Sequence, residues 1–158
     1  MKNTGNTFAD LSSIDVTSHL EYKQGLSYLQ WMACWSIIKL YDSKASFTIH
    51  RDDNGNPFFN TEAGAFVVTE LTINGETQVE TLPVLDYKNK SVQGEKLNTF
   101  DINSAYKRCL VKNAALFGLG AQASINGEGS PLDLNRGLGG GKKPISNNKK
   151  AASASISF

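Results

Sequence analysis

The chain has 158 residues, of which 40% are hydrophobic, so its composition fits one domain with a modest core plus tails. No apolar run reaches the roughly 18 residues of a membrane span, and residues 1–18 contain one lysine and no apolar segment of the kind found in secretory signals. The formal net charge of +1 excludes the uniformly basic surface of a general nucleic-acid binder, and we expect a soluble intracellular protein that does not associate with membranes.

The first third of the chain predicts a flexible segment followed by a helix. Residues 1–20 are rich in Asn, Ser and Thr, a composition that we expect to remain flexible. A helix is predicted from about Tyr28 to Tyr41, capped by Ser27, because apolar residues recur there at helical spacing. The residues that follow this spacing are Leu29, Met32, Ala33, Ile37 and Leu40.

A second apolar stripe on a neighbouring face of this predicted helix consists of Trp31, Trp35 and Ile38. A helix that is apolar over so much of its surface is buried on two sides. One side can face the protein's own sheet, and the other can face a second subunit. The stripe is therefore a candidate oligomer interface, with packing in the protomer's own core as the alternative.

The middle of the chain predicts an antiparallel sheet of three or four strands. Segment 45–51 alternates polar and apolar residues, segment 52–57 is typical of a turn, and Phe58 and Phe59 begin a return strand. Residues 65–73 form the next predicted strand, because they are rich in Val, Thr and Phe.

A hairpin follows at Asn74-Gly75, a pair that suits the two positive φ angles of a type I′ turn. The returning strand spans residues 76–85, and Pro83 indicates that this strand is an edge there or is ending, because proline offers no N–H to a further strand. One face of this strand is expected to carry Val79, Thr81, Pro83 and Leu85.

The next elements are a polar loop over residues 86–99 and a second helix from about Asp101 to Phe117. Asp101 or Asn103 can cap this helix, and the glycines that follow Phe117 can end it. The predicted fold class is therefore α+β: a helix, an antiparallel sheet, and a second helix packed on the sheet.

The last segment, residues 127–158, is rich in Gly, Ser, Asn and Lys, and we predict that it is a disordered tail. It holds five basic and two acidic side chains, a net of +3, so the rest of the chain carries −2 of the total +1. Contacts with phosphates must then come from a local stripe, repeated by oligomerisation, or from the tail.

The second predicted helix carries such a stripe. Arg108 and Lys112 are four residues apart and share a face, and Lys107 is adjacent. Cations at fixed spacing on a helix can follow a phosphate backbone without reading bases, although a merely solvated face shows the same pattern. The apolar residues expected to pack this helix on the sheet are Ile102, Tyr106, Leu110, Ala114 and Phe117.

The sequence contains few of the motifs that are typical of enzyme active sites. His19 and His50 are isolated, no nucleophile elbow or phosphate loop is present, and Cys34 and Cys109 lie in apolar helical patterns typical of buried thiols. We therefore expect no catalytic residue, no metal and no cofactor. Three tyrosines near predicted loops or helix ends could either stack on bases or pack in the core: Tyr22, Tyr28 and Tyr87.

The order of several motifs resembles the phage single-strand annealing proteins of the Sak type, a domain-of-unknown-function group in the Rad-fifty-two superfamily. The resemblance covers residues 21–126, which we take as one annealing domain. It rests on six motifs in order: KQGLSYLQW at 23–31, AFVV at 65–68, TLPVLD at 81–86, and then DIN, KRCLVK and FGLG between 101 and 120.

This resemblance implies a sheet with a helix laid across it, assembled into rings or filaments that hold single-stranded DNA in a positively charged groove. By that likeness Lys107, Arg108 and Lys112 are the DNA-contact candidates. Charge alone adds Lys88, Lys90 and Arg51 as weaker candidates.

The function we expect is ATP-independent annealing of complementary single strands in phage recombination, carried out by a homo-oligomer in the bacterial host cytoplasm. A host single-strand-binding protein or a phage exonuclease is an expected partner. The alternatives are a double-stranded nucleic-acid-binding module, an oligomeric interaction protein whose tail recruits a partner, and a metal-dependent nuclease.

Overall fold

The sheet is organised around one long central strand. The computed structural model describes residues 4–23 and 26–121, so the predicted tail at 127–158 lies outside the described residues. The strand β5 (Gly64–Ile73) pairs along most of its length with β6 (Glu76–Pro83) in antiparallel register. Its other edge is shared by β3 (Ser46–Ile49), which pairs with residues 69–72, and β4 (Phe59–Thr61), which pairs with residues 64–66. The expected antiparallel sheet is confirmed, with four strands.

The hairpin between β5 and β6 has the predicted turn. Asn74 and Gly75 have φ angles of +51° and +79°, so both adopt the left-handed conformation that a type I′ turn requires. The N–H of Asn74 also donates to Oδ2 of Asp42 at 2.8 Å, which ties the turn to the end of the preceding helix. Because β6 pairs only with β5 among the described strands, Pro83 does lie on an edge strand.

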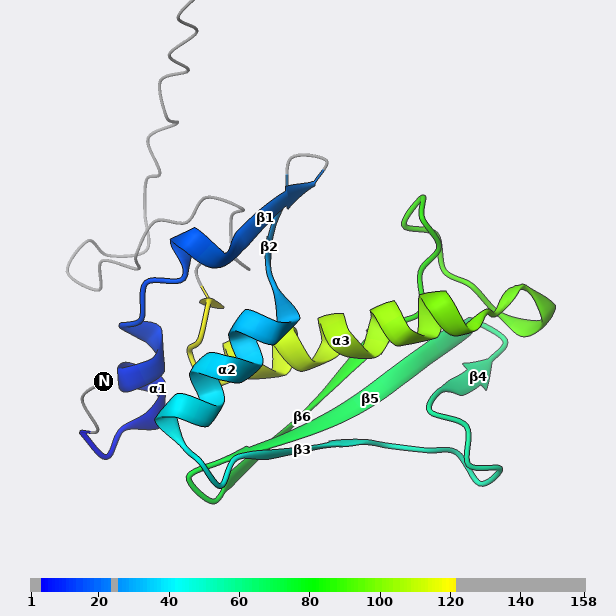
Figure 1. The fold of residues 1–158 in the computed structure, drawn as a ribbon. Helices are drawn as coiled ribbons and strands as arrows, with labels where there is room; N and C mark the ends of the chain where they lie inside the picture. The colour runs from blue at the N-terminus through cyan, green and yellow to red at the C-terminus, as the bar shows by residue number, and fades with distance from the viewer. Residues whose placement is uncertain (1–3, 24–25, 122–158) are drawn as a thin grey trace, which may run out of the picture.

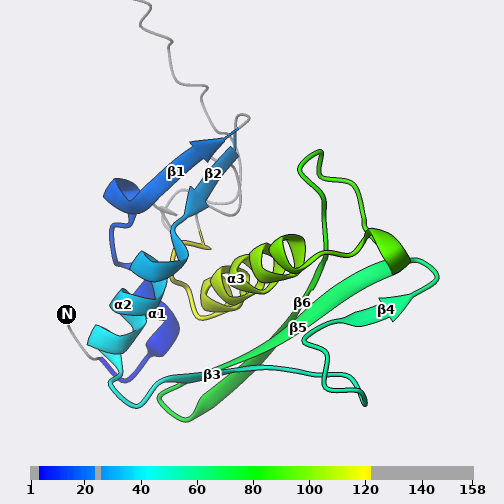
Figure 2. The same cartoon turned by 45° about the vertical axis from the view of Figure 1, so that its right-hand side comes forward.

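Helices cover only one of the two faces of the sheet in the described part of the chain. Along β5 the side chains alternate strictly. The helices α2 (Trp31–Tyr41) and α3 (Thr99–Leu116) lie over the face that carries Ala65, Val67, Thr69, Leu71 and Ile73 (Figures 1 and 2). In both views no helix lies on the opposite face. That face carries the stacked rings of Phe59 and Phe66, whose centroids are 5.3 Å apart.

The first predicted helix is shorter than expected. The helix α2 spans Trp31–Tyr41 and begins after Gln30, so Ser27 is not its cap. Residues 26–29 instead form β2 (Leu26–Leu29), which pairs with β1 (Leu20–Lys23) as a separate two-stranded sheet. The helical spacing continues through these residues, but pairing with a neighbouring segment decided their conformation, since context overrides propensity at helix ends.

Residues 4–20, part of the segment expected to be flexible, contain regular secondary structure. A short helix, α1 (Thr7–Ser12), is capped by Asn6, whose Oδ1 accepts the N–H of Ala9 at 3.0 Å. Leu11 is fully buried, and the hydroxyl of Tyr41 donates to Asp10 Oδ2 at 2.9 Å, so the segment is attached to the core. A 3₁₀ turn, η1 (Thr17–His19), leads from α1 to β1.

The helix α3 (Thr99–Leu116) follows a second 3₁₀ turn, η2 (Gly94–Lys96). Its N-cap is Asn98, whose Oδ1 accepts the N–H of Asp101 at 2.9 Å, so the prediction of Asp101 or Asn103 as cap was wrong. Asp101 instead lies in the first turn, where a carboxylate is favourable beside the helix N-terminus. Gly118 ends the helix with a φ of +97°, as the sequence predicted.

A buried polar contact fixes α3 on the sheet. Asn113 is fully buried, and its Nδ2 donates to the carbonyl of Thr69 on β5 at 2.9 Å and to the carbonyl of Gln78 on β6 at 3.1 Å. One turn earlier, the Cys109 thiol donates to the carbonyl of Glu80 and accepts from the Thr69 hydroxyl, both at 3.2 Å. Within the described residues the Oδ1 of Asn113 is buried without a partner. The amide therefore holds the helix through its donor side.

Among the described residues, no helix is long and apolar enough to cross a bilayer.

Replacing Gly118 by Ala should destabilise the domain through two effects. The left-handed conformation costs a non-glycine residue about 1–2 kcal/mol, and an added Cβ would lie 2.6 Å from the carbonyl oxygen of Phe8 in α1. That overlap should add about 1–3 kcal/mol. Gly55→Ala is the matched control, because its φ is +82° but no atom lies within 4 Å of an added Cβ. Urea unfolding should show a larger loss for Gly118→Ala; equal losses would mean that α1 does not pack tightly against the end of α3.

Replacing Asn113 by Asp should weaken the attachment of α3. A buried carboxylate facing two carbonyl oxygens should cost about 3–5 kcal/mol of unfolding free energy at pH 7. Burial raises the pKa of such a carboxyl above its unfolded value, so the native stability is retained at low pH and lost as pH rises through the raised pKa. The deficit measured by urea unfolding should therefore grow from pH 5 to pH 8.

Asn103→Asp is the control for charge on the same helix. Asn103 is half-buried, and its Oδ1 accepts a hydrogen bond from the Tyr106 hydroxyl, which a carboxylate can also accept. This variant should lose little stability. If both variants lost the same amount, the special role assigned to Asn113 would be refuted.

Candidate nucleic-acid interface

The attachment of α3 decides which of its side chains face solvent. Cys109 and Asn113 point to the sheet, and Arg108 and Lys112 each come one residue before them, so they lie one turn apart and about 100° round the helix from the sheet contact, on what we call the outward face of α3. Lys112 is exposed and Arg108 is half-buried. Lys107 is also half-buried, and the helical twist rotates it by about 100° from Arg108. The structure thus brings two of the three predicted cations together and places Lys107 on the side of the helix opposite Cys109.

Arg108 is held by an aromatic ring from another element. Its guanidinium carbon lies 5.8 Å from the centroid of the Tyr28 ring on β2, which is within the range of a cation–π contact. This contact restricts the long side chain without neutralising it. Tyr28 is the residue that sequence reasoning placed in the first helix, and its role in supporting Arg108 follows from the pairing of β1 with β2.

None of the three cations is neutralised by a carboxylate within residues 4–23 and 26–121. The ion pair present in this part of the chain joins His50 Nε2 and Glu70 Oε2 at 3.2 Å, on a different surface. Within those residues the charges of Lys107, Arg108 and Lys112 are therefore not compensated by an ion pair. An outward-facing helix side with unpaired cations can bind an anionic polymer.

Lys88 and Lys90 lie in a tight turn, residues 86–90, between β6 and η2. Both side chains are exposed, and the Lys88 ammonium lies 5.2 Å from the centroid of the Tyr87 ring. The turn projects on the same side of the sheet as α3 and the β1–β2 hairpin (Figures 1 and 2). These two candidates therefore share a side of the molecule with the cations of α3.

Arg51 lies elsewhere. Its Nη1 donates to the carbonyl of Gly55 at 2.7 Å, which closes the turn between β3 and β4. In both overall views this connection projects away from α3 (Figures 1 and 2). The structure therefore does not bring Arg51 together with the other predicted cations.

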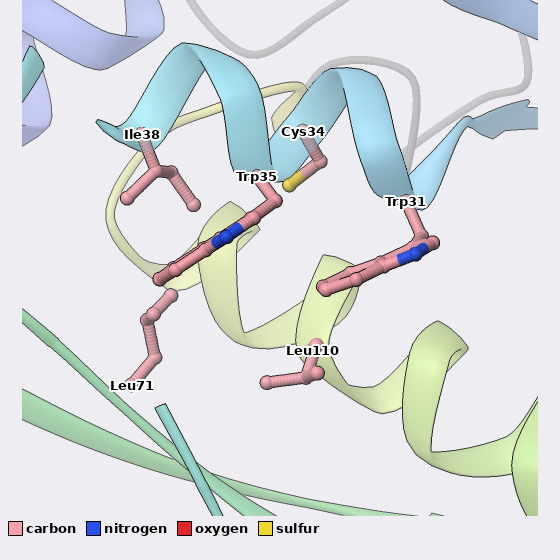
Figure 3. A pocket seen from close by; sticks show the side chains of 6 residues that line it. All are labelled: Trp31, Cys34, Trp35, Ile38, Leu71 and Leu110. Atoms are coloured by element: carbon pink, nitrogen blue, oxygen red, sulfur yellow. The ribbon is translucent and has the colours of Figure 1, made fainter. Parts of the chain in front are cut away.

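The tryptophan stripe of α2 packs inside the protomer. The Trp31 and Trp35 rings stack with centroids 6.4 Å apart, and both contact Phe47 of β3 edge-on. Figure 3 shows the two rings pointing from α2 toward Leu110 of α3 and Leu71 of β5, around a void of about 10 Å³. Such a void holds at most one water, so it is no ligand site.

The oligomer interface assigned to Trp31, Trp35 and Ile38 stays a prediction, and the packing alternative describes the protomer. Ile38 is only 2% exposed, so it offers no surface to a second subunit in this fold. The outward face of α2 instead carries Met32 and Leu40, both exposed.

The two thiols are poor nucleophiles and poor metal ligands. Burial raises the pKa of the Cys34 thiol to about 12. Burial also raises the pKa of the Cys109 thiol, and this outweighs the opposing hydrogen bond from Thr69. Both groups are therefore protonated at neutral pH. Within the described part of the chain no three His, Cys, Asp or Glu side chains are grouped so that they could hold a metal ion.

Comparison with known proteins gives one match. The model of the Sak single strand annealing protein family matches residues 6–155. This range extends in both directions beyond residues 21–126, the segment that carried the resemblance. No curated protein and no solved structure matches the chain. Because the family match spans nearly the whole sequence, the chain belongs to the Sak single strand annealing protein family.

Proposed function

We propose that this protein binds single-stranded DNA through the outward face of α3 and anneals complementary strands without a nucleotide cofactor. The observation that carries the proposal is the pair Arg108 and Lys112, fixed one turn apart on a helix anchored to the sheet and left without carboxylate partners in the described residues. Membership of a single-strand annealing family supports the same conclusion.

The chemistry needed is simple. Annealing is opposed by repulsion between two phosphate chains, and cations bound along one strand reduce that repulsion. The free energy comes from base pairing and stacking between the strands, so no ATP is required. The protein must only hold the backbone and leave the hydrogen-bonding edges of the bases accessible.

Oligomerisation explains how a chain of net charge +1 can bind a polyanion. Each subunit contributes a few phosphate contacts, and a ring or filament multiplies them along one strand. We place this assembly in the host cytoplasm during phage recombination. Recruitment of a host single-strand-binding protein or a phage exonuclease by residues 127–158 belongs to the same proposal and concerns a segment outside the described residues.

The triple variant Lys107→Ala, Arg108→Ala and Lys112→Ala tests the site. Each lost phosphate contact should lower the slope of log affinity against log salt by about 0.7 for single-stranded DNA, so the triple change should lower it by roughly 2. Fluorescence anisotropy with a labelled oligonucleotide gives the slope, and mixing two complementary labelled oligonucleotides gives the annealing rate. Both should fall, while thermal unfolding stays near that of the wild type.

Lys44→Ala compared with Lys112→Ala provides the charge-matched control. Lys44 is exposed in the turn between α2 and β3, away from the outward face of α3. The Lys44→Ala change should leave the binding of single-stranded DNA nearly unchanged. Full annealing by the triple variant, or equal weakening by Lys44→Ala, would place the site elsewhere. Stronger competition by duplex than by single strands would contradict the proposed substrate.

A further inference from the structure

The turn at residues 86–90 presents an aromatic ring to solvent. The Tyr87 side chain is 81% exposed, the largest value among the exposed large hydrophobic residues of the described chain. A single exposed aromatic is common on protein surfaces. What distinguishes Tyr87 is the rigidity of its turn and the charge on both sides of it.

Hydrogen bonds of Asp86 make the turn rigid. Its Oδ1 accepts the backbone N–H groups of Lys88 at 2.8 Å and Lys90 at 2.9 Å, and its own N–H donates to the carbonyl of Lys90 at 2.9 Å. The bond from the Lys90 N–H is the main reason that the pKa of Asp86 is lowered. The bridge between Leu85 and Ser91 closes the base of the turn. Its backbone is therefore ordered before any ligand binds, which reduces the entropy lost on binding.

The charges beside the ring suit a nucleic-acid strand. The Lys88 ammonium lies 5.2 Å from the centroid of the Tyr87 ring, and the high exposure of the ring leaves its other face to solvent. Lys90 is exposed two residues further on, and the Asp86 carboxylate is occupied by backbone N–H groups. An aromatic face flanked by two cations matches a base and its neighbouring phosphates.

The turn also lies on the side of the sheet that carries α3. It projects on the same side of the sheet as α3 and the β1–β2 hairpin (Figures 1 and 2). A strand held by Arg108 and Lys112 on the outward face of α3 therefore has a second group of cations on the same side of the molecule.

We propose that the turn at residues 86–90 is a second contact for single-stranded DNA, in which Tyr87 stacks on an unpaired base while Lys88 and Lys90 contact adjacent phosphates. The inference rests on the function proposed above and adds a stacking residue to it. Stacking uses the face of a base and leaves its pairing edge accessible to a complementary strand.

Two short oligonucleotides of equal length separate stacking from charge, one of deoxythymidine and one abasic. Tyr87→Ala should weaken binding of the deoxythymidine oligonucleotide about tenfold, because the stacking contact with one base is lost. It should leave binding of the abasic oligonucleotide unchanged, and Tyr87→Phe should restore wild-type affinity. The double change Lys88→Ala and Lys90→Ala should instead weaken binding of both oligonucleotides and lower the salt slope by about 1.4.

Phe100→Ala is the control for loss of an exposed ring, since Phe100 is 76% exposed in the first turn of α3. It should bind both oligonucleotides like the wild type. Suppose that Tyr87→Ala binds the deoxythymidine oligonucleotide with wild-type affinity while the α3 triple variant binds it weakly. That result would overturn the stacking role alone and point to a protein partner for the turn. Failure of the wild-type protein to bind either oligonucleotide would overturn this inference together with the proposed function.

Discussion

The docking of α3 on β5 and β6 is the constraint on which the rest of the described structure depends. Apolar side chains supply most of the contact, but they do not by themselves define the rotation of a helix about its axis. The Asn113 amide does, because its two donated hydrogen bonds reach carbonyls on two different strands. One turn earlier, the Cys109 thiol adds a second contact to β6, with the carbonyl of Glu80. A buried donor that is satisfied in only one rotation selects that rotation strongly.

This rotation determines what the helix presents to solvent. With Asn113 and Cys109 on the sheet, Arg108 and Lys112 lie about 100° round the helix from the sheet contact, where Arg108 is half-buried and Lys112 is exposed. The β1–β2 hairpin then supplies a ring beneath Arg108, so that an otherwise mobile cation has a limited range of positions. The same ring leaves the guanidinium charged. The molecule therefore keeps a small number of well-placed charges instead of a high net charge.

Few charges are an advantage for an annealing protein. A strand held too tightly cannot be transferred to a duplex, and contacts that read base edges would compete with the incoming strand. The phosphate contacts proposed for α3 and the stacking contact proposed for the turn at residues 86–90 would both leave base edges accessible. Their dependence on salt and on the presence of bases differs, and this difference makes the two contacts separable by measurement.

The sequence by itself determined the local elements of this protein. Periodicity identified the central strands and the second helix, Asn74-Gly75 identified the hairpin turn, and the spacing of Arg108 and Lys112 identified a shared face. These signals are local, because each depends on residues within one or two turns or along one strand. The tertiary structure decided the rest. It ordered α1 and made residues 26–29 a strand. It also buried Ile38, and it separated Arg51 from the other cations. Those outcomes depend on contacts between segments distant in the chain, and no local pattern encodes which distant segment will be the partner.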